Sequence, residues 1–138
     1  MQFPSTILDV LSHDERLQVL LGDIGVFGFR HVFAKYPKNI TNIGILEQAT
    51  VGVAAGMALA GDIPVVHTIA PFLVERAYEQ LKVDFGYQNL GGNFVSVGGS
   101  YDYAALGCTH HCPADLSLLM NIPGFELVVR KLYYRTQK

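Results

Sequence analysis

The sequence predicts an α/β domain, a three-layer α/β/α sandwich in which a mainly parallel sheet lies between two layers of helices. Its 138 residues are 50% apolar and 16% charged, a composition typical of one globular domain with a substantial core. Short apolar segments and segments with helical periodicity alternate about six times along the chain. We therefore expect a single domain over 1–138, with 131–138 as an exposed tail.

Local patterns justify each element in turn. Pro4 and Ser5 favour the start of a short helix over 5–12, because proline and serine are preferred at helix N-termini. The continuous apolar runs LQVLL at 17–21 and IPVVHTI at 63–69 are typical of strands buried on both faces. The remaining predictions are strands over 39–43, 93–97 and 125–129 and helices over 26–35, 47–59, 72–87 and 115–120.

Two of the predicted helices have informative patterns. In the helix over 47–59, Gly52 and Gly56 lie one turn apart, which predicts close packing against neighbouring elements. The helix over 72–87 is amphipathic, because apolar residues recur at every fourth position. These residues are Leu73, Ala77, Leu81 and Phe85.

Charge and hydropathy exclude several functional classes. The formal net charge is −2 and the basic residues are scattered, so we expect no nucleic-acid partner. The longest apolar stretch, at 49–61, has about 13 residues, whereas a membrane-spanning helix needs about 20. The N-terminus lacks the basic start of a signal peptide. We therefore expect a cytoplasmic protein without a membrane partner, and an apolar surface that contacts another protein.

Ligands of parallel sheets bind beyond the carboxyl ends of the strands. Four such ends are predicted, at 22–23, 43–44, 69–72 and 97–99. Glu47 follows the second of them and begins a long apolar helix. An acidic residue there can simply complement the helix dipole. Alternatively, a carboxyl in apolar surroundings can exchange a proton near neutral pH.

The sequence contains no convincing motif for metal binding, phosphate binding or a serine nucleophile. Cys108 and Cys112 enclose two histidines, so the cysteine pair and the histidine pair lie within one short loop. In structural zinc sites the two pairs of ligands are separated along the chain, so we predict no metal site. The sequence contains neither a G-x-G-x-x-G nor a P-loop motif. A G-x-S-x-G nucleophile motif is also absent.

Several segments resemble the pyrimidine-binding domain of thiamine-diphosphate enzymes of the transketolase type. They are NIGILEQATVGVAAGM at 42–57, GDIPVV at 61–66, FLVERAYEQ at 72–80, GCTHH at 107–111 and IPG at 122–124. They follow one another in uninterrupted order. The resemblance is to the C-terminal subunit of split transketolases and to deoxyxylulose-phosphate synthases. It implies the pyrimidine type of the thiamine-diphosphate-binding fold.

The resemblance implies a cofactor site for thiamine diphosphate. Glu47 would hydrogen-bond the ring nitrogen of the aminopyrimidine and favour the imino form that activates the cofactor, a catalytic role. Phe72 would stack on the pyrimidine ring. Ile69 occupies the cofactor-site position where the family usually has a tyrosine.

The resemblance also implies a substrate site. His110 would face the reacting centre as a catalytic and substrate-binding residue, although it could also be an ordinary loop histidine. His67 and Arg76 are further candidates for the same rim. Leu106 stands where relatives of this type have an aspartate that reads the sugar, which argues against a standard sugar-phosphate substrate.

The magnesium-diphosphate half of the family's site is missing from the sequence. After Gly22 and Asp23 comes Ile24 instead of glycine. The resemblance therefore implies a separate diphosphate-binding subunit that holds Mg²⁺, in a hetero-oligomer such as a heterotetramer. We expect a chain without the diphosphate-binding and C-terminal domains, whose helices over 47–59 and 72–87 would face the partner.

The function implied is that of a split transketolase-like enzyme subunit, inactive alone, which transfers a two-carbon ketol or acyl unit. Its substrate would be a small ketose or 2-oxo acid. Two alternatives remain: a subunit of a two-chain 2-oxo acid decarboxylase, and a non-catalytic assembly or regulatory domain.

Overall fold

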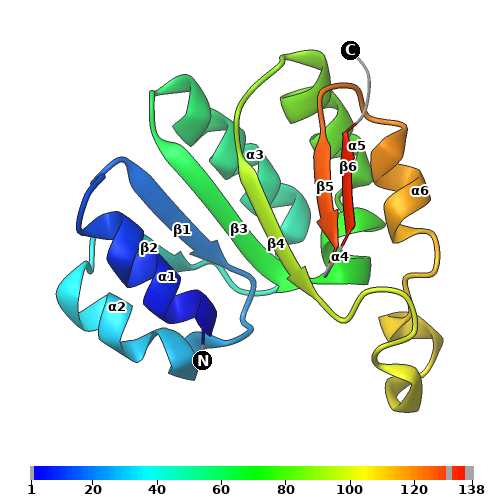
Figure 1. The fold of residues 1–138 in the computed structure, drawn as a ribbon, viewed down its shortest axis with the longest axis horizontal. Coiled ribbons are helices and arrows are strands. Elements are labelled where there is room, and N and C mark those ends of the chain that lie inside the picture. The colour runs from blue at the N-terminus through cyan, green and yellow to red at the C-terminus, as the bar shows by residue number, and fades with distance from the viewer. Residues whose placement is uncertain (1, 130–131, 136–138) are drawn as a thin grey trace.

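A parallel sheet forms the centre of the protein in the computed structural model, which describes residues 2–129 and 132–135 (Figure 1). Its strands lie in the order β2-β1-β3-β4, and each neighbouring pair is parallel. The prediction of an α/β fold around a mainly parallel sheet is confirmed. The strands are β1 (Leu17–Leu21), β2 (Ile40–Asn42), β3 (Ile63–Ile69) and β4 (Asn93–Val97).

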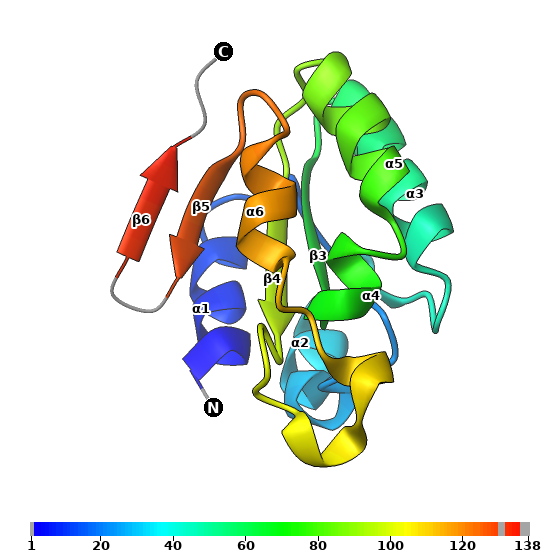
Figure 2. The ribbon, with the colours of Figure 1, turned by 90° about the vertical axis from the view of Figure 1, so that its right-hand side faces the viewer.

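Helices cover both faces of this sheet (Figure 2). On one face lie α1 (Gln2–Leu11) and α2 (Arg30–Lys35). A 3₁₀ turn at Val26–Phe29 directly precedes α2. On the other face lies α3 (Glu47–Leu59). Successive residues of β3 alternate between the two cores: Val65 packs with α1 and α2, and Val66 packs with α3.

The predicted helix over 72–87 is interrupted, so its continuity was wrong. It consists of α4 (Ala70–Val74), α5 (Tyr78–Gln80) and a π-helical segment, Leu81–Tyr87. The interruption has a local cause, since the Arg76 N–H donates to the Pro71 carbonyl, five residues back. Ala77, at φ −111° and ψ 20°, then leaves the helical conformation. The predicted apolar stripe is nevertheless buried at all four positions: Leu73, Ala77, Leu81 and Phe85.

The last elements lie beyond β4. Helix α6 (Asp115–Met120) is followed by β5 (Glu126–Val129) and β6 (Leu132–Arg135), which pair antiparallel as a separate two-stranded sheet. The tail expected over 131–138 is therefore a strand in part, because the backbone of Leu132–Arg135 hydrogen-bonds to β5. The expectation for 131 and 136–138 falls outside the described residues.

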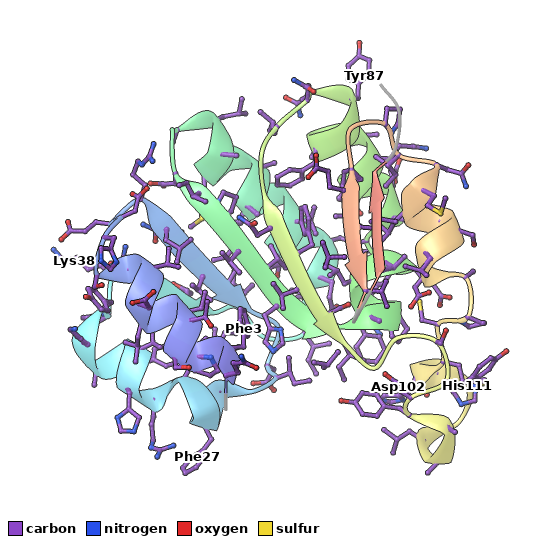
Figure 3. All side chains as sticks on the ribbon, viewed as in Figure 1. Phe3, Phe27, Lys38, Tyr87, Asp102 and His111 are labelled. Carbon is purple, nitrogen blue, oxygen red and sulfur yellow. The ribbon has the colours of Figure 1, made fainter. Side chains whose placement is uncertain are left out.

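A loop at 98–112 connects β4 to α6 and projects from the body of the molecule (Figure 3). Asp102 and His111 lie on it. It contains two short 3₁₀ turns, Ala104–Leu106 and Cys108–His110. The N–H of Cys112 donates to the Ser100 carbonyl at 2.8 Å, which closes the base of the loop.

Candidate functional site

Three predicted residues reach one place from the carboxyl ends of three different strands. Glu47 begins α3 after β2, Phe72 lies in α4 directly after β3, and His110 lies in the loop after β4. Arg76 follows α4 and joins them. We call these four residues the Glu47 cluster. Its place agrees with the expectation that ligand-binding residues gather at this edge of the sheet.

Glu47 is a buried carboxyl group with one satisfied and one unsatisfied oxygen. Its side chain is 2% exposed, and Oε2 accepts a hydrogen bond from Arg76 Nη1 at 2.8 Å. Oε1 is also buried but has no hydrogen-bond partner among the described residues. A buried charge without a partner costs several kcal/mol. Arg76 therefore stabilises Glu47 in its buried position and leaves Oε1 available to a ligand.

Phe72 links the charged pair to the histidine. The guanidinium carbon of Arg76 lies 4.1 Å from the centroid of the Phe72 ring, within the range of a cation–π interaction. The imidazole of His110 lies 5.3 Å from the same ring, edge-on at 68°. The half-buried Phe72 ring thus forms an aromatic platform next to Glu47.

The loop that carries His110 is fixed from two sides. The backbone N–H of Ser100 donates to Asp115 Oδ2 at 3.1 Å, which attaches the start of the loop to α6. Gly98 has φ +72°, and a Cβ atom there would overlap the Tyr103 ring, so only glycine lets Tyr103 lie on the backbone. Tyr103 in turn lies 6.4 Å from His110, edge-on. His110 therefore has edge-on contacts with the rings of both Tyr103 and Phe72.

His67 is placed elsewhere, on the α1 side of the sheet. Its ring is 6% exposed and lies 5.0 Å from the ring of Phe3, which points from α1 toward the sheet (Figure 3). Its Nδ1 lies 2.7 Å from the Val95 carbonyl oxygen, so this nitrogen carries the proton and donates. Burial lowers the pKa of His67, which keeps the ring neutral. The structure does not bring His67 into the Glu47 cluster.

Of the other predicted residues, Ile69 is half-buried at the end of β3, directly before α4. Leu106 is 57% exposed on the loop that carries His110. Cys108 is exposed and Cys112 is buried, and both thiols are free. Within the described chain, no group of three or more His, Cys, Asp or Glu side chains could hold a metal ion. No helix of that part is long and apolar enough to cross a membrane.

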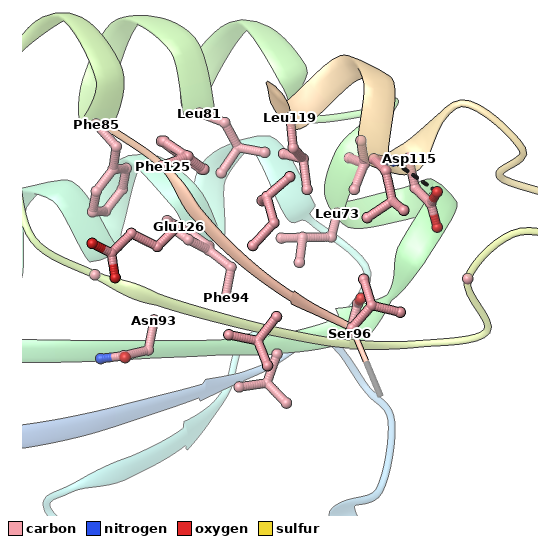
Figure 4. A pocket seen from close by; sticks show the side chains of 18 of the residues that line it. Leu73, Leu81, Phe85, Asn93, Phe94, Ser96, Asp115, Leu119, Phe125 and Glu126 are labelled. Carbon is pink, nitrogen blue, oxygen red and sulfur yellow. Dashed lines mark hydrogen bonds between the residues drawn. The ribbon is translucent and has the colours of Figure 1, made fainter. Parts of the chain in front are cut away.

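A cavity of about 840 Å³ lies apart from the Glu47 cluster (Figure 4). It separates β4 from β5 and is lined largely by apolar side chains. Asn93 and Glu126 lie at one end of it, and Ser96 and Asp115 lie at the other. None of the four residues of the Glu47 cluster lines this cavity, so cavity size alone does not locate the chemically distinctive groups.

Reasoning from the sequence missed two contributions to the site. The contact between Arg76 and Glu47 joins residues 29 positions apart, and no local pattern indicates it. Tyr103 was not singled out either. The signal that could have found it is the pair of adjacent glycines before it, 98–99, since glycine permits the close approach of a ring to the backbone.

The fold and the site together define a class: a parallel α/β domain with a buried carboxylate and an aromatic platform at the carboxyl edge of its sheet. Comparison with known proteins is more specific. The family model described as "Transketolase, pyrimidine binding domain" matches residues 4–137. The chain therefore belongs to the transketolase pyrimidine-binding domain family.

Individual relatives agree with this assignment. The chain is 40% identical over 127 residues to an uncharacterized 33.6 kDa protein in the fasciation locus of Rhodococcoides fascians, covering 92% of this chain and 41% of that protein. It is 34% identical to a subunit of the apulose-4-phosphate transketolase of Phocaeicola vulgatus, with the same coverage. A solved structure titled "Split gene transketolase, inactive beta4 tetramer" superposes with a TM-score of 0.77 at 27% identity, covering 90% of this chain and 40% of that one.

The chain thus spans about 40% of the length of these relatives. The family uses thiamine diphosphate, so membership implies this cofactor. The described residues fit its pyrimidine ring, because Glu47 Oε1 is buried without a partner and the Phe72 ring lies close to the same carboxyl-bearing pair. The carboxyl oxygen can hydrogen-bond to an aminopyrimidine, and the aromatic ring can stack on it.

Proposed function

We propose that this chain is the pyrimidine-binding subunit of a split thiamine-diphosphate-dependent enzyme of the transketolase type. It would transfer a two-carbon ketol or acyl unit and would be inactive without a separate subunit that binds the diphosphate and Mg²⁺. The observation that supports this most directly is that Glu47 Oε1 is buried and has no hydrogen-bond partner among the residues that the structure describes. Family membership and the split-transketolase relatives support the same proposal.

When bound, thiamine diphosphate supplies a nucleophilic carbon that adds to carbonyl groups. Glu47 would bind the pyrimidine ring nitrogen through Oε1 and move a proton at that atom. Phe72 would hold the ring plane by stacking. The burial of Glu47 excludes water from this contact and so strengthens it.

His110 would act on the substrate side. Its Nδ1 lies 3.0 Å from Thr109 Oγ1, which leaves Nε2 as the nitrogen for a substrate hydroxyl or carbonyl. Leu106 lies on the same loop and is largely exposed. It offers a substrate no hydrogen bond, which favours a substrate whose end near this loop is less polar than a sugar phosphate. His67 has no part in this proposal, because its ring is in the α1-side core.

The partner surface would be the exposed side of α3. Glu47 is the only charged residue of this helix, and it is buried. The exposed residues of α3 are apolar or small, apart from one glutamine: Gln48, Ala49, Gly52, Val53, Gly56 and Leu59. Next to them, Ile45 is 64% and Leu46 58% exposed. Such a continuous uncharged surface is typical of a protein–protein contact.

The close packing expected at Gly52 and Gly56 is not seen among the described residues. A Cβ atom at Gly56 would meet nothing within 4 Å, and one at Gly52 would meet only Asp84 Oδ2 at 3.9 Å. Both glycines lie on the exposed side of α3. In the proposed complex they would instead let the partner's backbone approach.

The first test is Glu47→Gln in the complex reconstituted with the diphosphate-binding subunit. We expect cofactor-dependent carbon–carbon bond transfer to fall by about 100- to 10,000-fold, the usual loss when a proton-transferring side chain is removed. Circular dichroism should show an unchanged fold. The matched control is Glu15→Gln, an exposed carboxyl in the turn before β1, which should retain full activity. Full activity of the Glu47 variant would contradict the mechanism.

Substrate profiling decides between the enzyme classes. Transfer of a two-carbon unit to an aldehyde acceptor supports the transketolase-like activity. Release of carbon dioxide without an acceptor would replace it with 2-oxo acid decarboxylation. If the chain neither associates with a diphosphate-binding subunit in gel filtration nor requires thiamine diphosphate in the complex, the enzymatic proposal fails and an assembly role replaces it.

A further inference from the structure

Arg76 contacts both of the groups assigned to the pyrimidine ring. Its Nη1 donates to Glu47 Oε2 at 2.8 Å, and its guanidinium lies 4.1 Å from the centre of the Phe72 ring. The two contacts fix Arg76 although its own side chain is 40% exposed. The family resemblance implied a place for Arg76 on the substrate rim, but its contacts are with Glu47 and Phe72, the residues proposed to bind the cofactor.

We propose that Arg76 is a positioning residue that orients Glu47 for the cofactor's pyrimidine ring. This inference rests on the proposed function. By holding Oε2, Arg76 fixes the rotation of the carboxylate and directs Oε1 to the ligand.

The asymmetry of the two oxygens carries this inference. If Arg76 merely filled the ligand's place, its fork of donors would be free to contact both oxygens, as guanidinium–carboxylate pairs often do. Instead only Oε2 has a partner among the described residues, while Oε1 is buried without one. A buried acceptor without a hydrogen bond is costly. A ligand that donates a hydrogen bond to Oε1 removes this free-energy cost, and Arg76 can keep its hydrogen bond to Oε2 while the ligand binds.

A second consequence follows from the stacking on Phe72. The guanidinium lies against the Phe72 ring, and this contact helps to hold Arg76 in the position from which it donates to Glu47. Lysine would keep the ion pair but lacks a planar group to stack. Charge and stacking can therefore be separated by substitution.

The test uses the full chain and the free pyrimidine part of thiamine, 4-amino-5-hydroxymethyl-2-methylpyrimidine. Binding is followed by NMR at the ¹³C-labelled carboxyl carbon of Glu47, in the wild type and in Arg76→Gln and Arg76→Lys. We expect Arg76→Gln to weaken binding by about tenfold or more, because the carboxylate loses its fixed orientation. Arg76→Lys should restore most of the affinity.

Arg30→Gln is the matched control, since Arg30 also stacks on a phenylalanine, Phe27, at 4.6 Å but lies outside the Glu47 cluster. It should bind the pyrimidine like the wild type. For the variants of Glu47, binding is read by calorimetry. In the Glu47→Gln background, Arg76→Gln should cause no further loss, because Arg76 acts through Glu47.

The outcomes separate this inference from the proposed function. If Arg76→Gln binds the pyrimidine as tightly as the wild type, or more tightly, the positioning role is overturned, whereas a loss in Glu47→Gln would still support the cofactor site. If the wild type fails to respond to the pyrimidine, and to thiamine diphosphate in the complex, both proposals fall. If Arg76→Gln weakens binding even without Glu47, Arg76 binds the ring itself and the inference is likewise overturned.

Discussion

Two cysteines in one loop show how strongly burial distinguishes chemically identical residues. Cys112 is fully buried beside Ala70 and Val74, whereas Cys108 is exposed. Burial raises the pKa of the Cys112 thiol to about 12, and the carboxylates of Glu75 and Asp115 contribute to this shift by disfavouring a further negative charge. Because the thiolate is the reactive form, the two residues should differ in reactivity.

We predict that maleimide or a disulfide reagent at pH 8 modifies one thiol per native chain, at Cys108. Mass spectrometry after digestion identifies the modified residue. In Cys108→Ser, labelling should disappear until the protein is denatured, when Cys112 reacts. Comparable labelling of both residues in the native wild type would contradict the burial of Cys112.

The residues of the candidate site also show what a sequence can reveal. The positions of Glu47, Phe72 and His110 after three successive strands follow from chain order, since parallel strands end at one edge. The face on which His67 lies could also have been read from the alternation of β3, because His67 shares a face with Val65. The Arg76–Glu47 pair could not, since it depends on the break after α4.

Among the helices and strands, α3 has one side that is buried against the sheet and one side that is exposed and uncharged. Its inner residues pack on the sheet, its first residue is Glu47, and its outer side has no charge. Glycine destabilises a helix interior by about 1 kcal/mol relative to alanine. The presence of Gly52 and Gly56 on the outer side therefore lowers the stability of the isolated chain, and the proposed partner contact gives a reason for it.

We predict opposite effects of substitution at Gly56 on folding and on assembly. Gly56→Ala should raise the free energy of unfolding by roughly 0.5–1 kcal/mol in urea titrations, since helix propensity improves and the new Cβ has open space. Gly56→Leu should weaken association with the diphosphate-binding subunit in analytical ultracentrifugation. Ser117→Leu, at an exposed position of α6, serves as control. Undiminished association of Gly56→Leu would exclude this side of α3 as the interface.

Sequence patterns predicted several elements well, including β4 and α6, which have no fully buried residue. The strands 17–21, 63–69 and 93–97 and the helices 47–59 and 115–120 have the predicted bounds. The predicted helix over 72–87 is interrupted because the N–H of Arg76 donates to the carbonyl of Pro71, five residues back instead of four. The pairing of β5 with β6 was not predicted, because the sequence after Val129 contains no glycine-containing turn motif of the type that signals a hairpin.

At the scale of the whole molecule, the neutral His67 ring makes stability depend on pH. The folded state holds the pKa of His67 below the ordinary histidine value of 6.5, because burial disfavours the charged ring. As the pH falls below about 6.5, the unfolded chain therefore binds a proton that the folded chain does not, and stability is lost. Above that range His67 is neutral in both states and contributes no pH dependence.

We predict that the free energy of unfolding of the wild type decreases between about pH 7 and pH 5.5 more steeply than that of His67→Asn, which retains a donor for the Val95 carbonyl. Urea titrations at each pH measure the difference. His31→Gln, at an exposed histidine, should follow the wild type. Parallel curves for the wild type and His67→Asn would show that the ring titrates normally.

The arrangement of strands also sets an order of assembly for the chain. In the main sheet, β1 pairs with β3 in a register that places Leu17 opposite Ile63, so a long loop must close before this ladder can form. The β5–β6 hairpin joins strands that are consecutive and close in sequence, and hairpins of this kind form within about 1–10 μs. Because non-local pairing slows folding, we expect the hairpin at the end of the chain to pair before the central sheet that carries the Glu47 cluster.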